Sequence, residues 1–164
     1  MKTCLKTLSL VLTTLSLISL ISNLAEIGFT GVTSHVIKYY RIISYDIFSL
    51  KGLIEINQTL VDLWTISFIG AAAYAKSPNI NDSKLISSLN LKSFGKLHRA
   101  FVFVIFGLTM LGIIIIYNAL NPFTYADELH EQPLDLYKES GKNLILIIFA
   151  LLLIFAYNAY APSL

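Results

Sequence analysis

The chain has few charged residues and almost no cysteine. Only 13% of its 164 residues are Asp, Glu, Lys or Arg, whereas a soluble domain averages about 25%. Cys4 is the single cysteine, which excludes an internal disulfide and a cysteine-rich metal site. At this length, residues 1–164 are predicted to form one domain, with no room for a separate catalytic domain.

Charge is missing altogether from two long apolar stretches, 100–120 and 144–161. A helix needs about 20 apolar residues to cross the ~30 Å hydrocarbon core of a bilayer. A soluble helix of that length would carry a polar face, and neither stretch has one. Both stretches are therefore predicted to span a membrane.

Sequence motifs for catalysis are also missing. The chain has no Cys-x-x-Cys pair, no glycine-rich phosphate loop and no Gly-x-Ser-x-Gly turn. His35, His98 and His130 lie outside the apolar stretches, so a haem within a helix bundle would lack axial ligands. We expect neither a cofactor nor enzymatic activity. Nucleic-acid binding is also not expected, because the one basic loop is short and lacks aromatic platforms.

A third apolar stretch, 7–24, follows Lys2 and Lys6 and resembles a secretory signal. Its cleavage site would be poor, because residues 23–25 offer one small residue where two are wanted. An uncleaved first span is the preferred interpretation, and a removed signal is the alternative.

The fourth apolar stretch, 60–75, would rise only ~24 Å as a helix, which is short for a span. Starting the helix near Leu53 gives a span over 53–75 and draws Glu55, Gln58 and Asp62 toward the membrane. The sequence then predicts an all-α, four-helix transmembrane bundle.

The loops differ in charge, and this sets the expected orientation. Basic residues dominate 76–99 and acidic residues dominate 121–143. Lys and Arg near span ends tend to stay in the cytoplasm, so both termini are predicted to be cytoplasmic. The preference for Lys over Arg and the richness in Ile and Asn suggest a bacterial inner membrane.

The segment 25–52 is too apolar for a solvated loop. It carries apolar side chains at helical spacing, opposite Lys38, Arg41 and Ser49. Those apolar residues are Val36, Tyr40, Ile43, Ile47 and Leu50. The pattern is typical of an amphipathic helix in the membrane interface, and a helix packed over the end of the bundle is the alternative.

The intramembrane polar residues are the first candidates for function. Glu55, Gln58 and Asp62 would share one face of the extended second helix, with Asn118 and Asn121 at similar depth. A carboxylate in hydrocarbon pairs, protonates or faces inward, so Asp62 could bind a cation or a proton. The alternative is that the helix starts near Leu60 and Asp62 is a favourable first-turn acid.

Two faces of small or hydroxylated residues are candidates for helix packing. In the predicted span 53–75, small residues recur at every fourth position, at Ser67, Ala71 and Ala75. Such a face lets a neighbouring helix approach closely. On the first span, 7–24, hydroxyl groups recur at Ser9, Thr13 and Ser16. They can form hydrogen bonds to a neighbouring helix or to carbonyl groups of their own helix.

A weaker hypothesis concerns the acidic loop. Its carboxylates and one imidazole could ligate a divalent ion, and their spacing matches no known metal site. These residues are Asp127, Glu128, His130 and Glu131. The alternative is that the charges keep this loop out of the cytoplasm.

Three functions of different class remain after these observations. The first is a small accessory protein that packs against other membrane proteins or itself within the lipid bilayer, with bacterial defence or immunity as one setting. The second is a minimal ion or proton conduit that uses Asp62. The third is a metal-dependent membrane enzyme built on the acidic loop.

Overall fold

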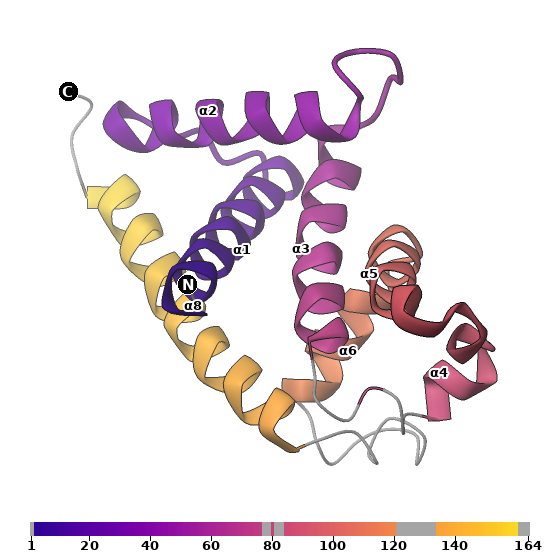
Figure 1. Ribbon diagram of the computed structural model, residues 1–164. Helices are drawn as coiled ribbons and strands as arrows, with labels where there is room; N and C mark the ends of the chain where they lie inside the picture. The colour runs from indigo at the N-terminus through magenta and orange to yellow at the C-terminus, as the bar shows by residue number, and fades with distance from the viewer. Residues whose placement is uncertain (1, 77–79, 81–83, 121–133, 161–164) are drawn as a thin grey trace. The chain divides into compact units, whose positions relative to one another are not determined.

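The computed structural model describes residues 2–76, 80, 84–120 and 134–160, and every longer element within them is helical (Figure 1). The elements are α1 (Lys2–Leu24), α2 (Gly31–Phe48), α3 (Gln58–Ala75), α4 (Lys84–Ser88), η2 (Leu91–Leu97), α5 (His98–Leu108), α6 (Leu111–Leu120) and α8 (Leu134–Tyr160). The all-helical class predicted from the sequence is thus found throughout the described part of the chain.

The chain divides into two compact units. Unit 1 contains residues 1–65 and 145–164, and unit 2 contains residues 66–144. The division falls inside α3 and inside α8, so each of these helices contributes a segment to both units.

Unit 1 buries polar side chains. Helix α2 packs against α1 and runs across the direction of α3 (Figure 1). The polar residues buried in this unit are Thr13, Thr14, Ser16, Ser19, Ser22, Ser44, Ser49, Asp62 and Thr65. The interior between its helices is therefore rich in hydroxyl groups and holds one carboxyl group.

Unit 1 exposes many large apolar side chains. On α8, Phe149 is 60% exposed and Leu152 is 63% exposed. On α2, Val36, Ile43 and Ile47 are also exposed. This distribution is opposite to that of most water-soluble proteins, which bury large apolar side chains and leave polar ones outside.

Helix α2 has two adjacent faces. Ile37, Tyr40 and Ser44 are buried against the rest of unit 1, while the exposed apolar residues lie beside them around the helix. The amphipathic helix predicted for 25–52 is thus present, but Tyr40 belongs to the face that packs inward. The helix packs on its neighbours, as expected for a helix over the end of the bundle, and still exposes an apolar face, as expected for a helix in the membrane interface.

Helix α3 begins later than the predicted start near Leu53. Residues 55–57 are not helical, and the side-chain Oδ1 of Asn57 accepts a hydrogen bond from the Thr59 backbone N–H at 2.9 Å. An asparagine in this position caps a helix by accepting from a first-turn N–H group. The cap fixes the helix start at Gln58 and leaves Glu55 outside it.

Unit 2 has a conventional apolar core. Tyr74 of α3 stacks on Phe106 of α5 with ring centroids 5.3 Å apart. The other buried members of the core are Ala71, Ile80, Ile86, Leu91, Val102 and Ile115. Three of these, Ile80, Ile86 and Leu91, come from the predicted basic loop. That segment therefore contains short helices and contributes to the core.

Glycine allows α3 and α6 to approach closely. A Cβ atom added to Gly112 would overlap the Ser67 carbonyl group, and one added to Gly70 would overlap the Gly112 carbonyl group. The two backbones are therefore in direct contact, as happens where small residues line a helix interface.

The stretch 100–120 was predicted to be one helix, and it forms two. Helices α5 and α6 are bent by 88°, and Met110 between them has a φ of 63°. Helix α5 ends at Leu108, and the hydroxyl of the next residue, Thr109, donates to the Ile105 carbonyl group. A residue with positive φ cannot continue a right-handed helix, so the apolar run changes direction here.

Within the described residues, one helical stretch is long and apolar enough to cross a membrane, Thr7–Leu24 of α1. A bent pair provides a second if its two arms are counted together, namely Leu91–Leu108, which is η2 with α5, and Leu111–Tyr117 of α6. The four predicted spans are therefore not confirmed by helix length and composition.

Candidate functional site

Asp62 is the centre of a buried polar cluster, which we define as Ser16, Tyr40, Gln58, Asp62 and Thr65. Asp62 lies in the second turn of α3 and is fully buried. Its Oδ1 accepts a hydrogen bond from the Tyr40 hydroxyl at 3.0 Å and another from Gln58 Nε2 at 3.1 Å. One carboxyl oxygen therefore receives donors from both α2 and α3.

The second carboxyl oxygen, Oδ2, is buried and has no hydrogen-bond partner among the described residues. Leaving a buried polar atom unpaired costs about 1–3 kcal/mol, and more when the group is charged. Such an unpaired acceptor is uncommon in folded proteins and calls for an explanation. The Ser19 hydroxyl, which accepts from Arg41, also interacts with this carboxyl group. Oδ2 makes no hydrogen bond to it within normal geometry and is available to a proton or a cation.

Hydroxyl groups connect the same region of α3 to its neighbours. Ser16 of α1 donates to the backbone carbonyl of Asp62 at 2.7 Å. Thr65 donates to the Val61 carbonyl at 2.9 Å, while the Tyr40 hydroxyl oxygen lies 3.4 Å from the Thr65 hydroxyl oxygen. The cluster therefore holds α1, α2 and α3 together through polar contacts.

Tyr40 keeps its proton over the whole physiological range. Burial raises the pKa of Tyr40 from 10.0 to about 12, with a smaller contribution in the same direction from the Asp62 charge. A neutral phenol has a single hydroxyl proton to donate. The shorter of its two contacts assigns that proton to Asp62 Oδ1.

Arg41 is adjacent to the cluster and anchors α2 to α1. Its Nε donates to the Ser19 hydroxyl at 2.9 Å, and its Nη2 donates to Asn23 Oδ1 at 2.9 Å. The Arg41 charge also interacts with Asp62 electrostatically. A cation next to a buried carboxylate reduces the free-energy cost of burying that carboxylate.

The structure brings together only part of the predicted acidic face. Gln58 and Asp62 are in hydrogen-bond contact, whereas Glu55 is exposed and precedes α3. The alternative hypothesis had the helix start near Leu60 with Asp62 in its first turn. The observed start at Gln58 is within two residues of that position and places Asp62, fully buried, in the second turn. Neither sequence interpretation describes the site fully.

The hydroxyl face of α1 is used in two ways. Thr13 donates to the Ser9 carbonyl of its own helix at 2.8 Å. Ser16 instead reaches α3. Both kinds of bond were considered from the sequence, which could not assign them to individual residues.

The small-residue face of α3 lies in unit 2. Ser67 and Ala71 are fully buried, and Ser67 donates to the Phe106 carbonyl of α5 at 3.0 Å. Ala75 is partly buried and packs on the same core. This face contacts the chain's own α5 and α6.

The remaining candidates are not described in the structure. Asn118 lies within α6, but its side chain is outside the described set, and Asn121 is outside the described residues altogether. The acidic loop residues Asp127, Glu128, His130 and Glu131 also lie outside them. No group of three or more His, Cys, Asp or Glu residues is placed to hold a metal in the part of the chain that is described.

Sequence reasoning did not identify Tyr40 and Arg41 as parts of the site. It assigned Tyr40 to a lipid-facing surface and Arg41 to the opposite, solvated one. The available signal was an arginine in an apolar segment, since such a residue is normally paired when it is not in water.

Comparisons of the chain with protein-family models, curated proteins and solved structures found no match.

Proposed function

We propose that this protein is an integral membrane protein that acts as a small accessory subunit, contacting other membrane proteins or another copy of itself. The observation that carries the proposal is the inverted polarity of unit 1. A set of Ser and Thr hydroxyl groups and the Asp62 carboxyl group are buried, whereas large apolar side chains of α2 and α8 are exposed. Lipid is the solvent in which that arrangement is favourable.

Helix lengths are compatible with crossing. Helix α3 has 18 residues, which corresponds to a rise of ~27 Å and is close to the ~30 Å hydrocarbon core. Helix α8 has 27 residues and includes residues 144–160 of the second uncharged stretch. We therefore propose four passages, formed by α1, α3, the α5–α6 pair and α8, in a bacterial inner membrane with both termini cytoplasmic.

The proposed contact surface is the outer face of α8. The small-residue face of α3 is occupied by α5 and α6, so a partner must bind elsewhere. Ile145 and Leu146 precede Phe149 by four and three residues, so the three share one face of α8, and all are exposed. A row of large apolar side chains at this spacing suits packing against another transmembrane helix.

Two measurements test this function. After alkaline carbonate extraction of membranes, the protein is expected in the pellet. A photoreactive phenylalanine analogue at position 149 should then form a discrete protein adduct, whereas the analogue at position 147 should not, because Ile147 on the same helix is only 4% exposed. A strictly monomeric species in native mass analysis, with only lipid adducts at position 149, contradicts the accessory role.

A cation or proton conduit through Asp62 is the second candidate. It is favoured by the unpaired, buried Oδ2 atom. In reconstituted vesicles, Asp62→Asn should abolish a cation or proton flux that Asp46→Asn leaves intact, since Asp46 is an exposed acid on α2. The conduit is excluded if the parent protein carries no flux above empty vesicles.

A further inference from the structure

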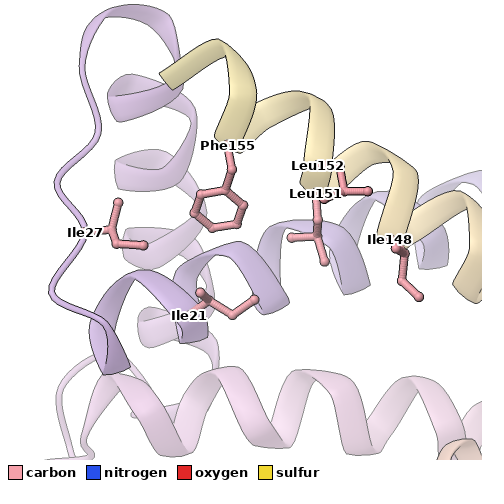
Figure 2. A pocket seen from close by; sticks show the side chains of 6 residues that line it. All are labelled: Ile21, Ile27, Ile148, Leu151, Leu152 and Phe155. Carbon is pink, nitrogen blue, oxygen red and sulfur yellow. The ribbon is translucent and has the colours of Figure 1, made fainter. Parts of the chain in front are cut away.

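Unit 1 contains an apolar groove between α1, the segment that follows it, and α8. The groove has a volume of about 360 Å³, which is within the ~300–1,000 Å³ range of small-ligand sites. Figure 2 shows the six side chains that line it, all of them hydrocarbon: Ile21, Ile27, Ile148, Leu151, Leu152 and Phe155.

A second hollow of about 250 Å³ adjoins the groove, because Ile27 lines both. Its wall includes Ser34, Lys38 and Arg41 of α2, and no acidic side chain lines it. Lys38 is exposed and has no ion-pair partner in the described part of the chain. The second hollow therefore combines positive charge with hydroxyl groups.

Arg41 is held in a fixed position at this hollow. Its Nε and Nη2 atoms bond to Ser19 and Asn23, while Nη1 makes no hydrogen bond to the described residues. A guanidinium group that is already ordered loses little side-chain freedom when it binds an anion.

The walls of the two hollows are tied together by Asn158 near the end of α8. Its Oδ1 accepts from the Thr30 backbone N–H at 3.2 Å, and its Nδ2 donates to the Gly28 carbonyl at 3.1 Å. Phe29 of the second hollow also contacts Phe155 of the groove, with ring centroids 5.9 Å apart. The segment that separates the hollows is thereby fixed to α8.

We propose that unit 1 binds one phospholipid with an anionic headgroup, with an acyl chain in the groove and the phosphate against Lys38 and Arg41. The charge of the second hollow selects this occupant. An apolar peptide segment would fill the groove but leave Lys38 without a counter-charge, and Arg41 with only the Asp62 carboxyl group nearby. An anionic phospholipid satisfies both hollows at once. The inference rests on the proposed membrane location, because a bilayer supplies this ligand.

The binding test uses the full-length protein in a mild detergent and native mass spectrometry. Phosphatidylglycerol and phosphatidylcholine with identical acyl chains are added at equal concentration. The protein is expected to retain phosphatidylglycerol with a preference of about 30-fold, the order that two basic residues give for an anionic headgroup. Equal retention of the two lipids overturns the proposal.

Two matched pairs of variants locate the site. Lys38→Ala should reduce the preference for phosphatidylglycerol, whereas Lys92→Ala, which removes an exposed lysine from unit 2, should not. Leu152→Trp should reduce retention of both lipids by filling the groove. Leu153→Trp is the control, since Leu153 is similarly exposed and does not line the groove.

The proposal is also overturned if both members of either pair behave alike. Its failure is distinguishable from failure of the membrane location, which carbonate extraction tests separately. A protein that pellets with membranes but shows no headgroup preference contradicts the lipid site alone.

Discussion

At the scale of single residues, Asp62 determines how the polar cluster is satisfied. Its Oδ1 accepts from two donors, while Oδ2 accepts from none in the described part of the chain. The carboxyl group is therefore needed as an acceptor on one side only. Substitutions at position 62 separate its role as an acceptor from its charge.

Asp62→Asn retains the oxygen that Tyr40 and Gln58 contact and removes the charge, so we expect a free energy of unfolding close to that of the parent protein. Asp62→Ala leaves both donors without a partner and should lower that free energy by about 1–3 kcal/mol. Unfolding in mixed detergent micelles measures the free energies of unfolding of the two variants. Asp46→Ala is the control for removing an exposed acid. A loss as large in Asp62→Asn as in Asp62→Ala would show that the charge itself stabilises the fold.

Because the Tyr40 hydroxyl is buried, we expect the protein to lose stability in strong alkali. Folding raises the pKa of Tyr40 from 10.0 to about 12, so the folded state holds the proton more tightly than the unfolded state. The contribution of the protonated Tyr40 hydroxyl to the free energy of unfolding is complete below pH 10 and is lost as the pH rises toward 12. The loss should be roughly 2–3 kcal/mol, measured as the pH dependence of unfolding in the parent minus that in Tyr40→Phe. Parallel curves for the two proteins would contradict the burial of this hydroxyl.

The sequence could identify only the local half of this site. Gln58 and Asp62 are four residues apart on one helix, so helical periodicity alone brings them together. Tyr40 and Ser16 reach Asp62 from other helices, and those contacts depend on how α1 and α2 rotate about their axes. A hydrophobic pattern does not fix that rotation when a helix is apolar on two adjacent faces, as α2 is.

At the scale of helices, the contact between α3 and α6 depends on Gly112. The small-residue face was recognisable from its spacing, while its partner was not, because Gly112 lies in an apolar run with no periodic small residues. The close approach is specific to a residue without a Cβ atom.

Gly112→Ala should lower the free energy of unfolding by about 1–3 kcal/mol, because the added methyl group meets backbone atoms that cannot move aside. Gly28→Ala is the matched control, since a Cβ atom there has no neighbour within 4 Å. Thermal unfolding in detergent compares the two. Equal melting temperatures for both variants would show that α3 and α6 are not in backbone contact.

The bend between α5 and α6 was not predictable from the residue pattern. The apolar run continues through Thr109 and Met110, and the chain has no proline between 79 and 121, although proline is the usual cause of a sharp bend. The turn depends instead on a methionine in the left-handed region, a conformation that no composition signal marks.

At the scale of the whole molecule, the proposed orientation can be tested with the native sequence. Cys4 is the single cysteine and is exposed. A membrane-impermeant maleimide should label it in inside-out vesicles and not in intact cells, because the amino terminus is proposed to be cytoplasmic. Glu131→Cys in a Cys4→Ser background provides the opposite control, with labelling expected in intact cells. Labelling of Cys4 from outside would contradict the orientation.

In the proposed topology, the right-angled turn at Met110 also determines on which side of the bilayer the chain ends. Helix α5 has 11 residues and rises ~16 Å, about half of the hydrocarbon thickness. If α5 and α6 together complete a passage, the number of crossings is even and both ends share one compartment. If α5 and α6 instead form a re-entrant segment that enters and leaves the bilayer on the same side, the number of crossings is odd and the two termini lie on opposite sides of the membrane. A reporter fused to the carboxyl end, compared with the label at Cys4, distinguishes a crossing from a return.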